Sequence, residues 1–282
     1  MDSAAADRLQ SILAGPEDNF SLAEAALLVA KDEYPGLDID AYMNRLDELA
    51  ANIKQRLGQD SGYENSILEL NQFLFDDYGL SGNIGDYYDP RNSFLNDVLD
   101  RKLGIPITLA IVYIEVGRRL GLPLEGVSFP GHFLVKLEAD QGDVVLDPFS
   151  GGICLSEEDL IARLEDMPLE EHPPVPELAR AIVAQPTGKK QILARILRNL
   201  KQIYVHHGEL TKALGMINRL LLITPNLPDE VRERAGIYEQ LECFQAAHED
   251  YERYLRLEPG APDAPDVHKR IVELQRVIAG IN

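Results

Sequence analysis

Three side chains in the middle of the chain, Thr108, His132 and Asp147, have the types that acyl-transfer catalysis combines. A hydroxyl can attack a carbonyl carbon when an imidazole takes its proton and a carboxylate orients that imidazole. Thr108 lies in the first turn of an expected helix, where free N–H groups and the helix dipole favour a nearby negative charge. His132 and Asp147 lie on consecutive expected strands. The three residues therefore outline a catalytic triad.

The spacing of His132 and Asp147 sets a condition on the turn between their strands. Alternation places both side chains on one face of the sheet if the turn has an even number of loop residues. A tight turn centred on Gln141-Gly142 pairs Asp147 with Lys136, which leaves it about 13 Å along the strand from His132 at ~3.3 Å per residue. A looser turn or a bulge is therefore needed to bring the imidazole and the carboxylate together.

The element that must position Thr108 is a helix within residues 104–123. Pro106 suits the first helical position, because its missing N–H has no partner there in any case. Gly121 suits the residue just past the last turn. Residues 105–116 are apolar on nearly every side, and a helix that is apolar all round is buried. The sequence therefore predicts a core helix around which the neighbouring elements pack.

Helices are expected before this core helix and strands after it. Capping signals and helical periodicity predict helices over residues 4–14, 21–34, 38–57 and 66–78, and from Asn92 or Ser93 to Leu103 with Gly104 as its C-terminal glycine. Apolar alternation predicts strands over residues 127–129, 132–137 and 144–147, and the acidic run after Ser156 opens a helix that ends near Leu164.

A change of composition marks a domain boundary after these elements. Residues 168–176 contain four prolines, which is typical of a linker. We therefore expect a first domain over residues 1–170, a linker over 171–189 and a second domain over 190–282.

The second domain repeats itself with a period of 34 residues. Tyr204, Ala213 and Pro225 recur as Tyr238, Ala247 and Pro259. This is the period of the tetratricopeptide repeat, in which Tyr, Ala and Pro occupy these positions. The sequence predicts two repeats, entered by a helix from about Lys190 and closed by a helix over residues 266–279.

Three motifs of the first domain resemble a known family. They are Gly104-Ile105-Pro106 with the helix end Arg119-Leu120-Gly121-Leu122-Pro123, then Pro130-Gly131-His132-Phe133-Leu134-Val135, and Leu146-Asp147-Pro148-Phe149. Together they resemble the transglutaminase-like core, which is related to papain-type cysteine proteases. With its tetratricopeptide tail, most of the chain (residues 20–275) is similar to an uncharacterised bacterial family labelled Sir-B-like. The resemblance implies an α+β fold: a helix-rich transglutaminase-like domain with a small antiparallel sheet, followed by an all-α tail.

The resemblance also implies where a nucleophile would be. Active transglutaminase-like enzymes open the core helix with Gly-x-Cys, and the Leu-Gly-Ile-Pro at its end follows fifteen residues after that cysteine. Leu120-Gly121-Leu122-Pro123 matches this helix end, and counting back fifteen residues from Gly121 reaches Pro106 at the cysteine position. His132 and Asp147 match the other two catalytic positions. The resemblance therefore implies a transglutaminase-like domain whose attacking sulfur is missing.

Thr108 has two interpretations. As a nucleophile it would form, with His132 and Asp147, the catalytic set of an amide or ester hydrolase or an acyltransferase. Its side chain, however, points about 200° away from position 106 at 3.6 residues per turn, and threonine needs a strong local base. Alternatively, Thr108 satisfies free N–H groups at the helix start, and the His132–Asp147 pair is an inherited structural hydrogen bond. This second interpretation favours a non-catalytic domain.

Other candidate residues have similar alternatives. Asn92 and Asn96 either line the same cleft or cap a helix and bridge the corner before the core helix. Cys154 is a second candidate nucleophile, but it follows Gly151-Gly152 in an expected loop, where nothing lowers a thiol pKa. The spacing of His, Cys and carboxylate residues predicts neither a metal site nor a cofactor site.

The expected repeats suggest which side chains bind a partner. Arg195, Arg198, Gln202 and Arg232 correspond to positions that face the concave groove of tetratricopeptide repeats. These side chains predict a clamp for a carboxylate-bearing peptide. In the alternative, Arg195 and Arg198 pack against the first domain or pair with its acids.

Composition narrows the partner and the compartment. A net charge of −20 over 282 residues argues against binding nucleic acid or an anionic membrane surface, since both require basic residues. No apolar stretch reaches the ~20 residues of a membrane helix, the N-terminus lacks a signal-peptide pattern, and two cysteines are too few for a disulfide framework. We therefore expect a cytoplasmic protein-interaction module.

Overall fold

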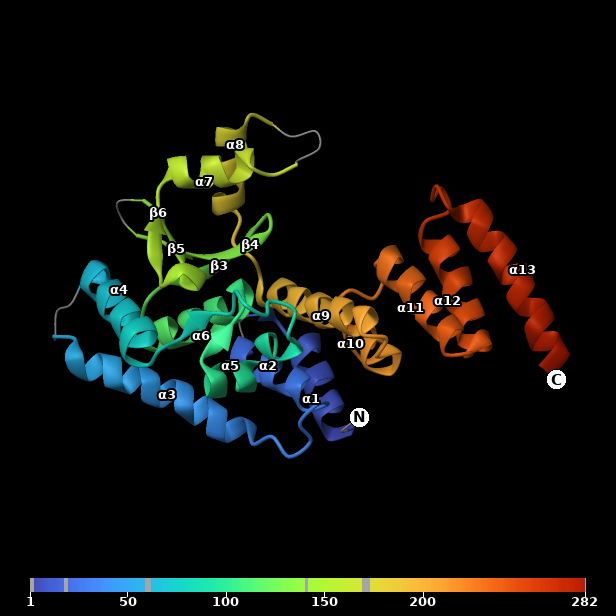
Figure 1. The fold of residues 1–282 in the computed structure, drawn as a ribbon, viewed down its shortest axis with the longest axis horizontal. Coiled ribbons are helices and arrows are strands. Elements are labelled where there is room, and N and C mark those ends of the chain that lie inside the picture. Colours follow the sequence, from blue (N-terminus) through green and yellow to red (C-terminus); the bar gives the residue numbers. More distant parts are fainter. Residues whose placement is uncertain (1–2, 18–19, 59–61, 140–141, 169–172, 282) are drawn as a thin grey trace. The chain divides into compact units, whose positions relative to one another are not determined.

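The computed structural model describes residues 3–17, 20–58, 62–139, 142–168 and 173–281. It divides into two compact units, Met1–Leu193 and Ala194–Asn282. Figure 1 shows the first unit as helices around a small sheet and the second as helices alone. This is the α+β architecture with a helical tail that the sequence predicts.

The N-terminal helices of the first unit confirm most of the expected boundaries. The side chain of Ser21 caps the second helix by accepting the Glu24 N–H, and Asp38 caps the third by accepting the Ala41 N–H. The fourth helix continues into a π-helical segment, Gln72–Asp77. The α-helices described before the core helix are α1 (Ser3–Ala14), α2 (Leu22–Ala30), α3 (Ile39–Arg56), α4 (Tyr63–Asn71) and α5 (Leu95–Arg101).

The core helix is confirmed as α6, Pro106–Arg119, with Pro106 at its first turn. Residues 106–117 are all buried. Gly121 follows with a φ of +86°, a conformation that glycine adopts without steric cost. A helix buried on every side can position residues that approach it from any direction, and α6 is therefore the centre of the first unit.

The corner before α6 differs from the expectation. Asn92 and Ser93 do not cap α5, whose N-cap is Phe94, and Lys102 follows the last residue of α5 as its C-cap with a φ of +60°. Leu103–Gly104 instead form strand β2, which pairs in parallel with strand β1, Ser81–Gly82. The Gly104 carbonyl accepts the N–H of Asn83. Gly104 therefore belongs to a short parallel sheet and is not the C-terminal glycine of a helix.

The main sheet is antiparallel with the order β3-β4-β5-β6. Its first three strands lie where alternation predicts them, whereas β6 is not predicted, because three residues are too few to show alternation. The strands are β3 (Leu124–Phe129), β4 (His132–Leu137), β5 (Val144–Asp147) and β6 (Ile153–Leu155).

Helices cover both faces of this sheet (Figure 1). On one side α6 contacts β3 and β4. On the other side lie α7 (Glu157–Glu165) and α8 (Val175–Ala184), which share an apolar cluster with the sheet. The buried members of this cluster are Val127, Phe129, Leu134, Val145, Leu155, Leu160, Leu164 and Ala179.

Helix α8 falls inside the segment 171–189, where the sequence suggests a linker. Ala179 of α8 is 1% exposed within the apolar cluster of the sheet, and the division between the units falls after Leu193. The prolines of this segment precede or begin a helix: Pro174 is the N-cap of α8. Proline at a helix start is compatible with the helix, and for that reason proline content alone is a weak sign of a linker here.

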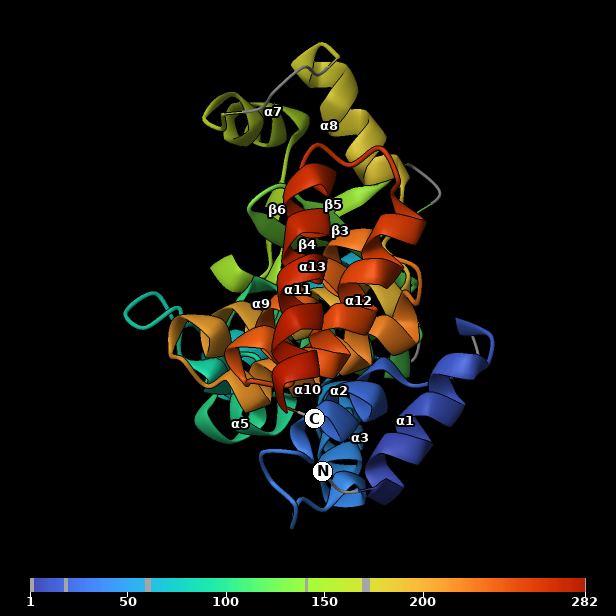
Figure 2. The same cartoon turned by 90° about the vertical axis from the view of Figure 1, so that its right-hand side faces the viewer.

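The second unit repeats its geometry as well as its sequence. The N–H of Glu209 donates to the Tyr204 carbonyl at 2.8 Å, and 34 residues later the N–H of Cys243 donates to the Tyr238 carbonyl at the same distance. Figure 2 shows its last helices side by side. The helices are α9 (Lys189–His206, which begins before the division), α10 (Leu210–Ile223), α11 (Pro228–Gln240), α12 (Phe244–Leu257) and α13 (Ala264–Ile281).

Candidate functional site

His132 and Asp147 meet on one face of the main sheet. A two-residue turn, Pro130-Gly131, joins β3 to β4, and Gly131 has a φ of +65°, as the second central residue of such turns requires. His132 follows at once as the first residue of β4, and Asp147 is the last residue of β5. Nε2 of His132 lies 2.8 Å from Oδ1 of Asp147. The structure therefore brings together the imidazole and the carboxylate that the sequence singles out.

The turn between β4 and β5 is looser than a tight hairpin, and this makes the contact possible. Leu137 pairs with Val144 and Lys136 with Val145, so the register is shifted by two residues from the tight turn at 141–142. Gln141 itself lies outside the described residues. The shift moves Asp147 two residues closer to His132 along the sheet, and the condition set by the sequence is met without a bulge.

Asp147 is fully buried, and its carboxylate is surrounded by hydrogen-bond donors. Oδ1 also accepts the backbone N–H of Phe149 at 3.1 Å, and Oδ2 accepts the Ser150 hydroxyl at 3.0 Å and a guanidinium N–H of Arg163 at 2.9 Å. Burial alone would raise the pKa of Asp147, but the hydrogen bond and charge of His132, with the bonds from Arg163 and Ser150, lower it to about 2. Asp147 is therefore ionised at neutral pH.

An ionised carboxylate only accepts hydrogen bonds, so Nε2 of His132 carries the proton in this pair. When the imidazole holds only this proton, its lone pair is on Nδ1, which is then the nitrogen available to a further partner. The His132 side chain is 19% exposed, and its ring meets the edge of the Phe149 ring with centroids 5.7 Å apart. The pair thus keeps the geometry of a general base with its orienting acid.

Thr108 is placed differently from a nucleophile. It is fully buried, and its Oγ1 donates to the Asn92 carbonyl at 2.7 Å and accepts the Ile105 N–H at 3.1 Å. Among the described residues, no hydrogen bond joins Thr108 to His132. The hydroxyl satisfies the backbone at the helix start, and Pro106 occupies the first helical position.

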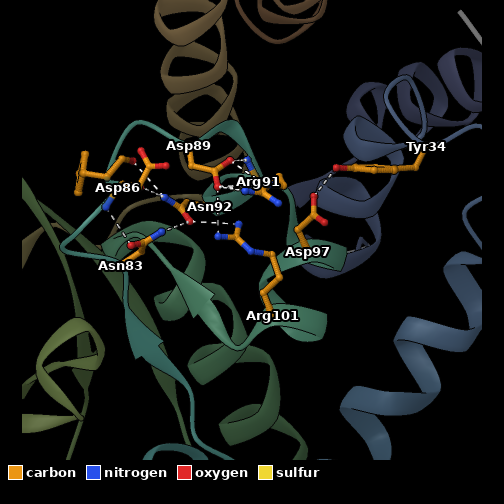
Figure 3. Close-up of polar contacts among 9 residues, drawn as sticks. Tyr34, Asn83, Asp86, Asp89, Arg91, Asn92, Asp97 and Arg101 are labelled. Carbon is orange, nitrogen blue, oxygen red and sulfur yellow. Dashed lines mark hydrogen bonds and ion pairs between the residues drawn. The ribbon is translucent and has the colours of Figure 1, made fainter.

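Asn92 holds a loop together (Figure 3). It is fully buried; its Nδ2 donates to the carbonyls of Asp86 and Tyr87, and its Oδ1 accepts from Nδ2 of Asn83 at 3.0 Å. Arg101 approaches the same oxygen at 3.4 Å. With all these partners inside the protein, the Asn92 side chain has a structural use and does not line an open cleft.

The same corner contains Asn96, which is 4% exposed. Its Oδ1 and the Ser93 hydroxyl have no hydrogen-bond partner among the described residues. Figure 3 shows the acids and arginines next to this corner: Arg91 and Arg101 pair with Asp89, and Tyr34 donates to Asp97 at 2.5 Å. Burial and the bond to Asp97 raise the pKa of Tyr34.

Cys154 lies on β6 and is exposed, as is Cys243 in the second unit. No hydrogen bond of the described residues joins Cys154 to His132, and its strand position lacks the helix N-terminus that activates a thiol. Within the described part of the chain, no group of three or more His, Cys, Asp and Glu side chains could hold a metal ion.

In the second unit, two of the expected clamp residues are already paired. Nε of Arg198 donates to Oε1 of Glu230 at 2.7 Å, and Arg232 forms an ion pair with Asp263. Gln202 is exposed, and Arg195 is partly buried. To bind a carboxylate of a partner, Arg198 and Arg232 would first have to leave Glu230 and Asp263.

Sequence reasoning missed three residues that support Asp147. Ser150 and Phe149 follow it in an Asp-Pro-Phe-Ser turn, where a short polar side chain two or three residues after Asp is a recognisable turn signal. Arg163 comes from α7, sixteen residues away. Nothing local links it to Asp147, since its placement depends on how α7 packs on the sheet.

A further network ties the segment after Asp147 to the core helix. The Tyr113 hydroxyl donates to Oδ1 of Asn71 at 2.7 Å, and Nδ2 of Asn71 donates to the Gly152 carbonyl at 2.8 Å. The N–H of Gly152 donates in turn to the Asp147 carbonyl at 2.8 Å. Hydrogen bonds therefore hold the backbone carbonyl of Asp147 in place as well as its carboxylate.

Among the described residues, no helix has both the length and the apolar character required to cross a membrane.

Two family models match the chain. The model described as the transglutaminase-like superfamily matches residues 40–198, and the tetratricopeptide repeat model matches residues 200–271. These are the two parts that the sequence motifs indicate.

Curated relatives are similar over almost the whole chain. A "UPF0162 protein" of Xylella fastidiosa (strain 9a5c) is 40% identical over 258 residues, which cover 92% of this chain and 91% of the relative. A "UPF0162 protein" of Vibrio cholerae is 30% identical and covers 88% and 90%. The human "F-box only protein 21" is 31% identical over 167 residues, 51% of this chain and 26% of that protein.

Proposed function

Because this chain belongs to the transglutaminase-like superfamily and to the bacterial UPF0162 family, we propose that it is a non-catalytic protein-interaction module of the bacterial cytoplasm. The observation that carries the proposal is the use of the Thr108 hydroxyl. It is fully buried and donates to the Asn92 carbonyl, while the position of the family's cysteine holds Pro106. A hydroxyl that is buried and bonded to the backbone cannot reach a substrate carbonyl.

The surroundings of Asp147 support the same proposal. Besides His132, this carboxylate accepts from Arg163, Ser150 and the Phe149 backbone. These bonds join β5, the following turn and α7. The His132–Asp147 pair accordingly contributes to the fold of the sheet.

The second unit supplies the interaction surface. Stacked tetratricopeptide repeats present extended surfaces to proteins or peptides, and the tetratricopeptide repeat model matches residues 200–271. The partner class is a protein or peptide. The internal pairing of Arg198 and Arg232 makes a simple arginine clamp less favourable than a partner that contacts the exposed repeat surface around Gln202.

The alternative function is acyl chemistry, in which the chain hydrolyses or transfers an amide or ester. It is favoured by one observation, the 2.8 Å contact that leaves Nδ1 of a partly exposed His132 available as a base. In this alternative Thr108 attacks, and its hydroxyl must first leave the Asn92 carbonyl.

Two substitutions at Thr108 separate the two functions. Thr108→Val removes the hydroxyl and keeps the shape, so it should lower the free energy of unfolding by about 1–3 kcal/mol, because the Asn92 carbonyl and the Ile105 N–H lose a buried partner. Thr108→Ser retains the hydroxyl and should cost less. After incubation with p-nitrophenyl acetate, neither Thr108→Ser nor the wild type should carry an acetyl group on residue 108, which peptide mapping by mass spectrometry measures.

A capture experiment tests the interaction itself. Affinity-tagged wild type and His132→Ala, cross-linked in bacterial cells, should recover the same set of proteins in equal yield. A covalent acyl adduct on Thr108, or turnover that Thr108→Val and His132→Ala both abolish, would contradict the proposal and support the alternative.

A further inference from the structure

The two edge strands of the main sheet differ in their hydrogen bonding to neighbouring segments. At the β3 edge, the Thr187 N–H donates to the Gly126 carbonyl at 2.7 Å and its Oγ1 accepts the Ser128 N–H at 2.8 Å. This edge is therefore covered by the chain itself. At the other edge, β5 is the one neighbour of β6 among the described strands, and Ile153 and Cys154 are exposed. An open edge strand offers unpaired backbone N–H and C=O groups to another chain.

A groove runs beside this open edge. Its volume is about 880 Å³, and it is lined by described residues of α4, β4, β5 and β6 and by Ala139, Gly142 and Asp143; Figure 1 shows α4 next to the β6 end of the sheet. Three large apolar side chains on its walls are exposed to solvent: Tyr63 at 46%, Leu68 at 60% and Ile153 at 49%. Exposed apolar side chains gathered in one groove next to an unpaired strand indicate a docking surface.

The groove also has a charge. Glu64 and Asp143 line it, and no Lys or Arg is among its described lining residues. Lys136 approaches Asp143 at 3.4 Å and offsets part of that charge, whereas Glu64 has an exposed position in the first turn of α4. The chain as a whole carries a net charge of −20. A basic occupant is therefore complementary to this groove and an acidic one is not.

The floor of the groove is fixed before anything binds. Asn71, at the end of α4, donates to the carbonyl of Gly152, the residue before β6, and accepts the Tyr113 hydroxyl of the core helix. Both ends of this bridge are in the core of the first unit. A pre-organised surface loses less conformational entropy when a peptide docks, and these bonds fix the position of α4 relative to the start of β6.

We propose that the groove between α4 and β6 binds an extended basic segment of another protein, which adds to β6 as a fifth strand. Main-chain hydrogen bonds to the β6 edge would supply affinity. Alternate apolar side chains of the segment would contact Tyr63 and Leu68 of α4, and its lysines or arginines would lie near Glu64. This site belongs to the first unit and does not depend on the repeats of the second.

The test uses synthetic peptides and the full-length chain. The probe is a fluorescein-labelled decapeptide of alternating lysine and valine, titrated with protein and followed by fluorescence anisotropy. The comparison peptides replace lysine by glutamate, or carry N-methyl groups on every second amide, which removes the donors needed for strand addition. We expect the lysine–valine peptide to bind and the other two to bind at least tenfold more weakly.

Substitutions inside and outside the groove then test where the peptide binds. Glu64→Lys should weaken binding about fivefold, whereas Asp40→Lys, which changes an equally exposed first-turn acid of α3, should not. Ile153→Asp and Leu68→Asp should each weaken binding about tenfold or more, because each puts a carboxylate on an apolar wall. Circular dichroism of every variant verifies that the fold is retained, and Glu64→Lys stays informative if an aspartate variant does not fold.

Hydrogen exchange supplies an independent readout. Amides of residues 153–155 should exchange at least tenfold more slowly with the peptide bound, since strand addition buries the edge. Equal binding of the N-methylated peptide would mean that hydrophobic side-chain contacts alone hold the peptide, without strand addition, and would overturn the proposal. No binding of the lysine–valine peptide, or the same affinity for Glu64→Lys as for wild type, would overturn it too, whatever the repeats of the second unit bind.

Discussion

At the scale of single residues, the first unit concentrates its polar contacts on one buried carboxylate. Asp147 contacts His132 and Arg163 on opposite oxygens, and the Ser150 hydroxyl and Phe149 N–H come from the turn that follows it. A buried charge is costly unless it is paired and hydrogen-bonded. The arrangement therefore makes the fold of the sheet depend on this group remaining ionised.

Asp147→Asn should destabilise the chain by about 2–4 kcal/mol, because it removes the charge that pairs with Arg163 and leaves a donor where an acceptor is needed. Urea denaturation followed by circular dichroism measures the change. Asp166→Asn, at an exposed acid near the end of α7, is the control and should stay within about 0.5 kcal/mol of wild type. Equal stabilities for the two variants would show that the network around Asp147 adds nothing.

The depressed pKa of Asp147 predicts a dependence of stability on pH. The folded-state pKa of about 2 is below the ordinary value of 3.8, so the contribution is complete above pH 3.8 and is lost as the pH falls towards 2. Its size is on the order of 2 kcal/mol. Unfolding free energies at pH 5, 4, 3 and 2.5 should show wild type and Asp147→Asn converging towards low pH, and a constant difference between them would contradict the assignment.

The residue types of the site were predictable, and their contacts were only partly so. His132 and Asp147 stand in recognisable strand and turn motifs. Thr108 was identified as a hydroxyl at a helix start, but its partner, the Asn92 carbonyl, depends on how an irregular loop folds against α6. Arg163 reaches Asp147 from a helix packed on the sheet. Contacts made through tertiary packing leave no local signal in the sequence.

At the scale of elements, the turn between β5 and β6 connects the site to the core helix. Gly151 and Gly152 both have positive φ, +77° and +75°. A Cβ on Gly152 would lie 2.1 Å from Oδ1 of Asn71, whereas a Cβ on Gly151 meets nothing within 4 Å. The two glycines thus share a backbone conformation and differ only in what surrounds them.

Gly151→Ala should cost about 1–2 kcal/mol, the ordinary penalty for an alanine in the left-handed region. Gly152→Ala should cost at least about 1–2 kcal/mol more, because Asn71 must move and release the Gly152 carbonyl or the Tyr113 hydroxyl. The difference between the two midpoints of urea unfolding isolates the contact with Asn71. Identical midpoints would mean that Asn71 moves aside without loss.

The two repeats have different residues at one position with a left-handed backbone. Gly208, shortly after α9, has a φ of +72°, and the equivalent residue 34 positions later, Glu242, has a φ of +57°. A side chain in the left-handed region is strained, whereas glycine is not. Glu242→Gly should therefore stabilise the chain by about 0.5–1 kcal/mol, and the matched change Gly208→Ala should destabilise it by about 1 kcal/mol. Thermal unfolding measures both, and a loss of stability in Glu242→Gly would contradict the expectation.

Elements with strong periodicity or clear ends were predicted well. Pro106 and Gly121 mark the ends of α6 because proline and glycine have few alternatives in these positions. Strand β6 and helix α8 were missed for physical reasons. Three residues carry no alternation, and the prolines around α8 suggest a linker until its apolar face is seen packed on Leu160 and Leu164.

At the scale of the whole molecule, charge is the dominant property. Forty-seven acidic residues against 27 basic ones give the net charge of −20. Like charges spread over a compact surface repel and oppose folding. Repulsion between exposed charges is screened over about 8 Å at physiological ionic strength.

Raising sodium chloride from 10 to 150 mM should therefore raise the thermal midpoint by about 2–5 °C. A variant in which three exposed acids are neutralised, Asp40→Asn, Glu48→Gln and Glu64→Gln, should respond less. A midpoint that falls with added salt would mean that attractive ion pairs outweigh the repulsion. Differential scanning calorimetry at the two salt concentrations decides between these outcomes.

The positions of the two cysteines have a practical consequence. The chain has two, Cys154 in the first unit and Cys243 in the second, and both thiols are exposed. Nitroxide labels would therefore attach to one site in each unit without any added mutation. Pulsed electron paramagnetic resonance on the doubly labelled chain would then give the distribution of distances between the halves, and the width of that distribution would reveal whether they are hinged or fixed.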